Sequence, residues 1–484
     1  MTTPFGTLAT DDRFDLLIDG KLVVGDRQLE VVDPATGEVF ARCSCASAEQ
    51  LDRAVEAAAA AYPRWSRLSI ERRQAKLIEM AEVIERELEP LARLLTSEQG
   101  KPLADARTEV GGAGYFLRHF AAQSMPVEVI EDSETRRVEL HRSPLGVVAA
   151  IVPWNFPLLT AVIKIGAALL TGNTVVLKPA PTTPLTALKF GELVAEVIPA
   201  GVINIVTDQN DLGEALTSHP LVRRVSFTGS TATGSKVMRS AAETLKRVTL
   251  ELGGNDCGIV LDDCDPATVA PKLFDAAFMN NGQVCVAMKR LYVAEAQYDA
   301  ICDNLAELAR AAVVGPGLQQ GTQLGPVQNR MQFEKIKMLI EETRKEATIV
   351  AGGDLPDGPG FFINPTIVRD IADDARLVTE EQFGPVLPVL KYSSIEEAIE
   401  RANDTSFGLG NSVWSSNLEK ACEVARLLDS GSVWINKHGD VSPDVPFAGA
   451  KMSGIGVEMA EHGLSEFTQV KVVNIAKGVV VAAD

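Results

Sequence analysis

Between Gly146 and Leu261, short apolar runs rich in β-branched residues alternate with longer amphipathic segments. Strands that are buried on both faces read as nearly continuous apolar runs, and helices connect such strands in parallel sheets. The pattern predicts an α/β unit in which helices cover a parallel sheet, a layout typical of nucleotide binding. The expected strands cover residues 146–152, 174–178, 201–206, 224–228 and 248–251.

The remaining sequence predicts two further units, as a length of 484 residues allows. After Gly254 the alternation of strands and helices restarts, which indicates a second α/β domain. Residues 127–141 alternate polar and β-branched side chains, which favours a two-stranded ribbon outside the main sheet, and the strand-like tail at 467–476 is a candidate partner for it. The second domain has expected helices at 266–279, 298–312 and 328–345, and expected strands at 291–294, 386–391, 412–414 and 432–436.

Composition and charge exclude several classes of function. The net charge of −19 opposes binding to nucleic acid or to an anionic membrane surface, because both require clustered Lys and Arg. No stretch reaches the roughly 18 apolar residues of a membrane span. The seven scattered cysteines and five separated histidines form neither a disulfide framework nor an obvious zinc site. Since the first residues also lack the pattern of a targeting segment, we expect a cytoplasmic protein without a metal site.

Three polar residues are expected at the carboxyl ends of strands in the first sheet. Asn155 lies in a Pro-Trp-Asn-Phe-Pro turn after the first strand, Lys178 ends the second, and Glu251 ends the fifth. In an ordinary loop the Asn would serve the turn and the charged groups would be solvated. At a ligand-binding edge, the amide is instead a candidate oxyanion-hole donor, the ammonium a candidate ligand of ribose or phosphate, and the carboxylate a candidate general base.

Two further segments carry candidate chemistry. Phe-Thr-Gly-Ser at 227–230 leads from a strand into a helix and presents backbone N–H groups that suit a pyrophosphate, although such turns often only cap helices. Cys285 follows a Gly-Gln turn. A thiol has a pKa of about 8.5 and reacts as the thiolate, so catalysis requires surroundings that lower this pKa. Free cysteines are more often inert and buried, so the case for Cys285 depends on the groups around it.

Six motifs, in matching order and spacing over nearly the whole chain, resemble the aldehyde dehydrogenase superfamily. They are Pro-Trp-Asn-Phe-Pro at 153–157, Lys-Pro at 178–179, Phe-Thr-Gly-Ser at 227–230, Glu-Leu-Gly-Gly-Asn at 251–255, Gly-Gln-Val-Cys at 282–285 and Glu-Gln-Phe-Gly-Pro at 381–385. The resemblance implies a Rossmann-type nucleotide-binding domain (1–125 and 144–253), an α/β catalytic domain (254–455) and a small β oligomerisation ribbon (126–143 and 466–484). A homodimer or homotetramer is the usual assembly of such proteins.

The resemblance also implies a reaction, the oxidation of an aldehyde to a carboxylic acid with NAD or NADP. Cys285 would attack the carbonyl, and Asn155 with the Cys285 backbone N–H would hold the oxyanion of the thiohemiacetal. Hydride transfer would leave a thioester, and Glu251 would activate the water that hydrolyses it. The positions that match cofactor contacts in the family are Trp154, Lys178, Pro181, Gly229, Ser230, Leu252 and Glu381.

The positions that match the substrate tunnel of the family are mostly apolar, and none is basic. This composition favours an uncharged, apolar aldehyde, aliphatic or aromatic, over a semialdehyde that carries a carboxylate. The tunnel positions are Phe156, Thr160, Ile163, Val284, Val441 and Phe447.

Three departures from the family pattern stand out. Pro181 replaces the acid that many NAD-preferring members carry three residues after the lysine, which removes a ribose hydrogen bond and also a repulsion of the 2′-phosphate of NADP. NAD is favoured, and NADP stays open. The segment 208–213 has fewer glycines than usual, and Glu458 lacks the preceding Arg that is often found.

Other functions fit the motifs less well. A CoA-acylating semialdehyde dehydrogenase would form the same thioester but would not need Glu251. A non-catalytic structural or binding protein on the same fold would not need Cys285, Asn155 and Glu251 together. A phosphate-binding kinase or reductase built on the Gly229 turn would leave these three residues unexplained, and the chain has no P-loop.

Overall fold

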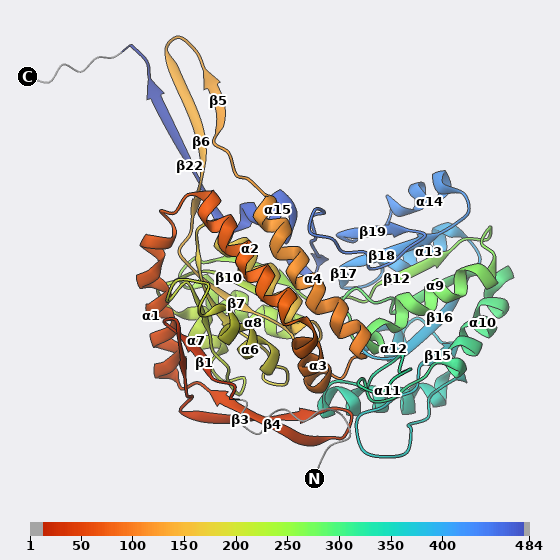
Figure 1. Cartoon of the computed structure of the whole chain (residues 1–484). Helices are drawn as coiled ribbons and strands as arrows, with labels where there is room; N and C mark the ends of the chain where they lie inside the picture. The colour runs from red at the N-terminus through yellow and green to blue at the C-terminus, as the bar shows by residue number, and fades with distance from the viewer. Residues whose placement is uncertain (1–12, 479–484) are drawn as a thin grey trace, which may run out of the picture.

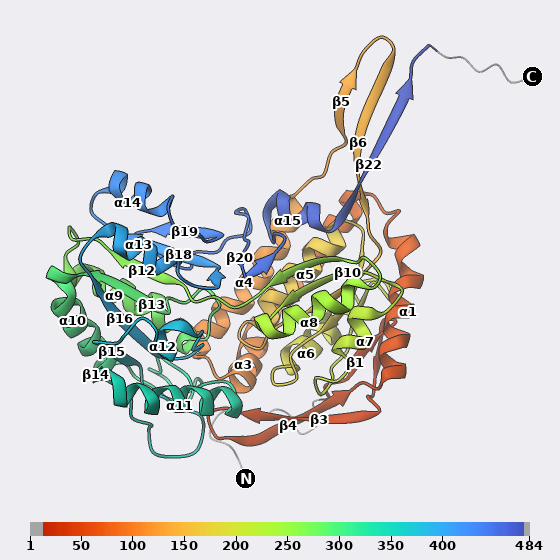
Figure 2. The same cartoon turned by 180° about the vertical axis from the view of Figure 1, so that it is seen from behind.

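The computed structural model describes residues 13–478, so the parts of the expected domains at 1–12 and 479–484 lie outside the described residues. Two α/β units lie side by side and a three-stranded sheet projects from the first of them (Figure 1, Figure 2). The predicted fold class is therefore confirmed. None of the described helices is long and apolar enough to cross a membrane.

The first unit is built on an eight-stranded sheet in the order β2-β1-β9-β8-β7-β10-β11-β21. Its five central strands, β7 to β11, pair in parallel, and they coincide with the five strands expected from the apolar runs. Strands β1 and β2 extend one edge in antiparallel pairing. The strand bounds are β1 Leu16–Ile18, β2 Lys21–Val23, β7 Val147–Ile151, β8 Thr174–Lys178, β9 Ile203–Ile205, β10 Val222–Thr228, β11 Arg247–Glu251 and β21 Gly454–Ile455.

Helix α5 is the most apolar helix around this sheet, and it is buried along nearly its whole length. Its only charged residue is Lys164, which is itself buried. The helices of the first unit are α1 Ala48–Trp65, α2 Ile70–Arg86, α3 Leu88–Gln99, α4 Leu103–Ala122, α5 Pro157–Leu170, α6 Leu185–Val194, α7 Gly213–Ser218 and α8 Thr231–Ala242. A separate two-stranded sheet, β3 Arg27–Asp33 with β4 Glu38–Cys45, lies below them in Figure 1.

The second unit is built on a seven-stranded sheet in the order β14-β15-β16-β13-β12-β18-β19, in which all pairs except β14 with β15 are parallel. The four strands expected here are confirmed as β13, β16, β18 and β19, whereas β12, β14 and β15 were not anticipated. The bounds are β12 Cys257–Val260, β13 Arg290–Ala294, β14 Thr348–Ala351, β15 Thr366–Arg369, β16 Val386–Tyr392, β18 Gly410–Trp414 and β19 Ser432–Ile435.

The helices of the second unit confirm the three that the sequence predicts, now seen as α9, α10 and α11. Helix α9 runs into a short 3-10 turn, η1, that leads to Cys285. The helices are α9 Pro266–Phe278, η1 Met279–Gly282, η2 Glu295–Gln297, α10 Tyr298–Ala311, α11 Arg330–Glu346, α12 Arg376–Thr379, α13 Ile395–Asn403 and α14 Leu418–Ala425.

The projecting sheet consists of β5 Glu128–Asp132, β6 Arg136–Pro144 and β22 Thr468–Ala476, in the order β22-β6-β5. Thr468 pairs with Pro144 and Ala476 with Arg136, so the expected pairing of the tail with the ribbon is confirmed. Several apolar side chains on this sheet are exposed, among them Val129, Ile130, Val470 and Val472.

Near its end the chain returns from the second unit to the first. Strand β21 pairs with β11 in antiparallel fashion, with Glu251 opposite Gly454. The return places Glu458 against α5, and α15 Ala460–Glu466 then leads into β22. Strands β17 Phe407–Gly408 and β20 Ala450–Lys451 pair beside this return. The predicted domain limits stay predictions, and the return shows that residues 454–455 belong to the first sheet.

Candidate active site

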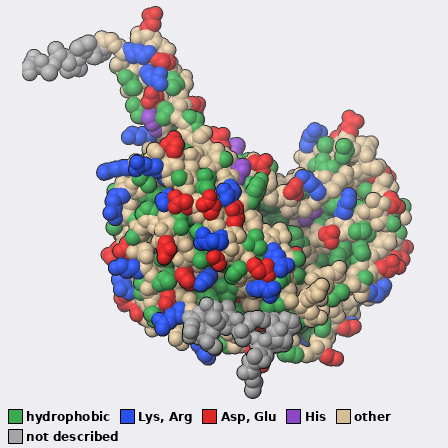
Figure 3. All heavy atoms as spheres, viewed as in Figure 1, with side chains coloured by type: hydrophobic (Ala, Val, Ile, Leu, Met, Phe, Trp, Pro, Cys, Tyr) green, Lys and Arg blue, Asp and Glu red, His purple; other side chains and the backbone are tan. Residues whose placement is uncertain are grey.

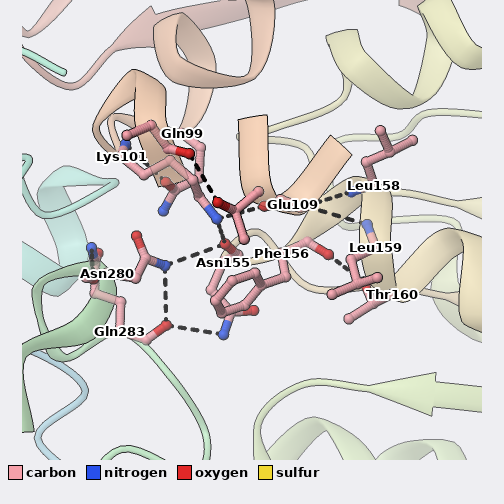
Figure 4. Close-up of polar contacts among 12 residues, drawn as sticks. Gln99, Lys101, Glu109, Asn155, Phe156, Leu158, Leu159, Thr160, Asn280 and Gln283 are labelled. Carbon is pink, nitrogen blue, oxygen red and sulfur yellow. Dashed lines mark hydrogen bonds and ion pairs between the residues drawn. The ribbon is translucent and has the colours of Figure 1, made fainter. Parts of the chain in front are cut away.

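Asn155 and the segment before Cys285 come together from the two units. Asn155 lies in the turn between β7 and α5, and its Nδ2 donates a hydrogen bond of 3.0 Å to the carbonyl oxygen of Gln283 (Figure 4). The Nδ2 of Asn280 reaches both the Asn155 carbonyl (3.3 Å) and the Gln283 carbonyl (3.4 Å). The amide of Asn155, in the turn after β7, is thereby fixed next to the residues that lead from η1 to Cys285.

The turn that carries Cys285 depends on its glycine. Gly282 has a φ of 72°, and a Cβ there would collide with the carbonyl of Gly384. Gly254 is equally confined, because a Cβ would lie 2.5 Å from the carbonyl oxygen of Cys285. Only glycine fits such close approaches, and together they bring the thiol segment against the end of β11.

The pKa of the Cys285 thiol is raised above its ordinary value, first by burial and then by the negative charges of Asp256, Glu251 and Glu381. The Val286 N–H acts in the opposite direction by donating to the sulfur. In the protein alone, the surroundings of Cys285 therefore act against the lowered pKa that catalysis requires. Cys285 is only half-buried as a residue, but the desolvation of its thiol and the three nearby carboxylates both disfavour the charged form.

Glu251 is buried at the end of β11, and neither of its carboxylate oxygens has a hydrogen-bond partner within residues 13–478. Burial raises its pKa well above the ordinary range, the charge of Glu458 raises it further, and the ammonium of Lys164 opposes both. Lys164 forms a buried ion pair with Glu458 and donates to the hydroxyl of Ser226 at 3.1 Å. Glu251 thus has the raised proton affinity of a general base.

Glu381 lies in the loop between α12 and β16, beside the glycine turn that follows β11. Its Oε1 accepts a hydrogen bond of 3.0 Å from the Gly254 N–H, and burial raises its pKa. A Cβ at Gly253 would collide with this carboxylate, so the paired glycines admit it to the site. Trp154 reaches the same loop, because its ring packs edge to face on Phe383 with 5.2 Å between centroids.

The Gly-Ser turn at the start of α8 presents a helix N-terminus. Ser230 is the N-cap and accepts from the Thr233 N–H at 3.3 Å, and the Gly229 N–H donates to the Glu251 carbonyl at 3.0 Å. Leu252 packs so closely on Gly234 that a Cβ there would collide with it. The hydroxyl oxygen of Thr228 is buried without a partner among the described residues. A helix N-terminus and an unpartnered hydroxyl at this edge fit the pyrophosphate of a dinucleotide.

Lys178 forms a buried ion pair that the sequence did not predict. Its Nζ lies 2.6 Å from Oδ1 of Asp208, and both side chains are almost fully buried. The other oxygen, Oδ2, accepts from the Leu212 N–H at 3.0 Å. Pro181 follows in the loop after β8. The available signal was that Lys178 ends one buried strand and Asp208 comes soon after the next one.

The expected tunnel residues come from the start of α5, the residue before Cys285 and the chain between β19 and β20. Phe156 and Thr160 lie at the start of α5, where the Thr160 hydroxyl donates to the Phe156 carbonyl at 2.7 Å, and Ile163 is buried one turn further on. Val284 is buried directly before Cys285, and Phe447 is buried and pairs with Glu458 through two backbone hydrogen bonds. Val441 is 36% exposed on the loop after β19.

Lys164, Asp208 and Glu458 are functional candidates whose partners sequence reasoning missed. A lone charge in an otherwise apolar helix was the signal for Lys164. No cluster of three or more His, Cys, Asp or Glu side chains able to hold a metal ion occurs in the part of the chain that the structure describes.

Fold and site together define an α/β enzyme in which a nucleotide-binding type of sheet meets a unit that carries a half-buried thiol. The aldehyde dehydrogenase family model matches residues 23–473. Phenylacetaldehyde dehydrogenase of Pseudomonas fluorescens is 40% identical over 484 residues, 95% of each chain. Retinaldehyde dehydrogenase 3 of Homo sapiens is 41% identical over 464 residues, 92% of this chain and 91% of its own. The NAD+ complex of an aldehyde dehydrogenase from Bacillus cereus aligns with a TM-score of 0.95 and 36% identity, over 98% of this chain and 100% of that one.

The chain belongs to the aldehyde dehydrogenase family. The resemblance found in the motifs is thereby confirmed, and with it the class of enzyme, an NAD(P)-dependent oxidoreductase that acts on an aldehyde group.

Proposed function

We propose that this enzyme oxidises an uncharged, apolar aldehyde to the carboxylic acid through a thioester on Cys285, with NAD as the preferred cofactor. The observation that carries the proposal is the meeting of three groups at one edge: the Asn155 amide, the Cys285 segment and the buried, unpartnered carboxylate of Glu251. A nucleophile, an oxyanion donor and a base are what acyl transfer through a thiol requires.

Cys285 Sγ attacks the aldehyde carbonyl after its proton has passed to Glu251, whose raised pKa suits it to accept one. Asn155 uses one N–H on Gln283 and has a second N–H for the oxyanion of the thiohemiacetal. The Cys285 backbone N–H is the other donor, since it makes no hydrogen bond within residues 13–478. A bound dinucleotide supplies the hydride acceptor. After Glu251 has released the thiol proton to solvent, it takes a proton from the water that attacks the thioester, and Cys285 leaves as the thiolate.

The residues around the Gly229 turn fit the phosphates of a dinucleotide, with Trp154, Leu252 and Glu381 bordering the path to Cys285. The Asp208 carboxylate supports NAD over NADP, because it places a negative charge beside Lys178, the residue expected at the ribose. A 2′-phosphate would meet that charge, whereas a ribose hydroxyl can hydrogen-bond to it. Asp208 thus offers a substitute for the acid that Pro181 replaces. The Bacillus cereus relative was solved as an NAD+ complex, which agrees with this preference.

The proposed substrate class rests on apolar positions in the same hydrophobic cluster as Cys285, chiefly Phe156, Val284 and Phe447. Two relatives are named for aldehydes with hydrocarbon bodies, phenylacetaldehyde and retinaldehyde. We further propose a homodimer or homotetramer, because the projecting sheet exposes apolar side chains that an assembly would bury. The cytosol is the proposed compartment, since the seven cysteines are free.

The test is the formation of reduced cofactor from NAD and, separately, from NADP, with aliphatic and aromatic aldehydes and without CoA. We expect the wild type to reduce NAD with apolar aldehydes and Cys285→Ala to be inactive. Turnover that begins only when CoA is added would instead identify the acylating alternative and remove the role given to Glu251. Faster turnover of carboxylated semialdehydes than of apolar aldehydes would overturn the substrate class.

A further inference from the structure

A buried ion pair lies directly behind the Asn155 turn. Lys101, in the short link between α3 and α4, places its Nζ 2.5 Å from Oε2 of Glu109 on α4, and the two side chains are 0% and 1% exposed (Figure 4). Neither residue takes part in the proposed chemistry. A buried ion pair is weak evidence of a stabilising role, because apolar residues of similar volume often stabilise a fold as well or better. The contacts of the pair point to another role.

Both members of the pair bind the backbone at Asn155 and in the first residues of α5 that follow it. Lys101 Nζ donates to the Asn155 carbonyl oxygen at 2.9 Å and lies 3.9 Å from the centroid of the Phe156 ring. The second oxygen of Glu109, Oε1, accepts from the Leu158 N–H (3.1 Å) and the Leu159 N–H (3.3 Å). Helix α5 has no side-chain cap of its own, since its N-cap is Phe156. Glu109 therefore caps α5 from another helix.

The Asn155 carbonyl also accepts from Asn280 Nδ2, so two donors from different units fix this one peptide group. With its backbone fixed, Asn155 can move only by rotation about its side-chain bonds. The hydrogen bond from its Nδ2 to the Gln283 carbonyl restricts that rotation. An oxyanion donor is effective only when it is held in position before the charge develops. The ion pair is built to do this for the Asn155 amide.

We propose that Lys101 and Glu109 are positioning residues for the oxidation, which act by holding the Asn155 backbone so that its amide meets the oxyanion. The inference rests on the proposed role of Asn155. The pair should therefore affect the rate at which the thioester forms and leave the affinity for the cofactor unchanged.

The central variant is Lys101→Met combined with Glu109→Gln, which leaves no unpaired buried charge and retains an oxygen that can accept from the Leu158 N–H. Arg107→Met is the matched control, because Arg107 lies on the same helix and forms an exposed ion pair with Glu89 at 2.8 Å. Each protein is compared with wild type in three measurements: the single-turnover rate of reduced-cofactor formation, the Kd for NAD, and thermal unfolding. Asn155→Ala and the combination of all three substitutions complete a double-mutant cycle.

We expect the Lys101 and Glu109 double variant to fold, to bind NAD with unchanged Kd and to lose about tenfold in single-turnover rate, less than the 10²–10³-fold expected for loss of an oxyanion donor. In the Asn155→Ala background the same two substitutions should change the rate less than about twofold, because their effect passes through Asn155. The Arg107 control should match wild type.

The inference would be overturned if the Lys101 and Glu109 substitutions lowered the single-turnover rate by the same factor in the Asn155→Ala background as in the wild type. That outcome would leave the proposed function intact. An Asn155→Ala enzyme with the wild-type rate would instead overturn the proposed role of Asn155. If the double variant does not fold, the same cycle is run with Glu109→Gln alone, which retains the shape of the side chain, and the same two outcomes decide.

Discussion

Replacing Asp208 by Asn should weaken the discrimination between NAD and NADP. The change removes the charge that lies 2.6 Å from the Lys178 ammonium and retains an oxygen that can accept from the Leu212 N–H. At that separation and an effective dielectric constant of about 20, Coulomb's law gives an attraction of about 6 kcal/mol before desolvation is counted. Removing one member of a buried ion pair costs about 3–5 kcal/mol in practice. Because Asn retains hydrogen bonds, we expect a loss of about 3 kcal/mol in the free energy of unfolding.

The same change releases the Lys178 ammonium for a ligand. A 2′-phosphate would gain an unpaired cation and lose a repelling carboxylate, so kcat/KM with NADP should rise about tenfold relative to NAD, which corresponds to about 1.4 kcal/mol. The assay is initial-rate kinetics with each cofactor at saturating aldehyde, beside chemical denaturation of the protein alone.

Asp211→Asn is the matched control, because Asp211 lies in the same loop and its ion pair with Arg27, also 2.6 Å long, is partly exposed. Exposed pairs contribute about 0–1 kcal/mol, so this control should leave both stability and cofactor preference nearly unchanged. The reasoning is refuted if Asp208→Asn leaves the NADP to NAD ratio of kcat/KM unchanged, or if the control shifts it equally.

Three further changes test other parts of the site. Asn155→Ala should lower the single-turnover rate about 10²–10³-fold with little change in the Kd for NAD, and a fall below tenfold would contradict its role. Lys164→Met removes the ammonium that opposes the raised pKa of Glu251, so the pH at which turnover reaches half its maximum should move upward, and a downward move in the pH–kcat profile would contradict this. Gly282→Ala should cost more than about 3 kcal/mol in denaturant unfolding, because a Cβ adds a collision with Gly384 to the strain of positive φ. The control Gly321→Ala, at a φ of 88° with no neighbour within 4 Å, should show the strain alone, and equal losses would argue against the collision.

The sequence predicted those strands that are fully buried and whose own residues are mostly apolar. Strands β7 to β11 are recognisable because their apolar runs stand between clear turns. Strand β12 is only four residues, Cys257–Val260, with a glycine among them, and β21 is two residues whose pairing with β11 depends on the return of a distant segment. Such strands are defined by neighbours and not by their own composition, so periodicity cannot find them.

The residues of the candidate site likewise fall into those that the sequence predicted and those that only the structure shows. Motifs pointed to Asn155, Glu251 and Cys285, whereas the groups that hold or tune them came from contacts across the chain. Lys101 bonds a carbonyl 54 positions away, and Lys164 pairs with Glu458 at a separation of 294 positions. The carboxylates that raise the pKa of Cys285 were missed for a related reason, since their approach to the thiol is a property of the assembled site.

The return of the chain through β21 has a consequence for synthesis on the ribosome. Lys164 emerges 294 residues before its partner Glu458, so a nascent first unit contains a buried ammonium without its counter-ion. Burying an unpaired charge is costly, and α5 therefore cannot settle fully against the sheet until the last part of the chain has been made. The thiol of Cys285 is also translated before the groups that set the proton affinity of Glu251 are complete. In a chain that ends before Glu458, the Lys164 ammonium would have no counter-ion beside Glu251, the proposed base.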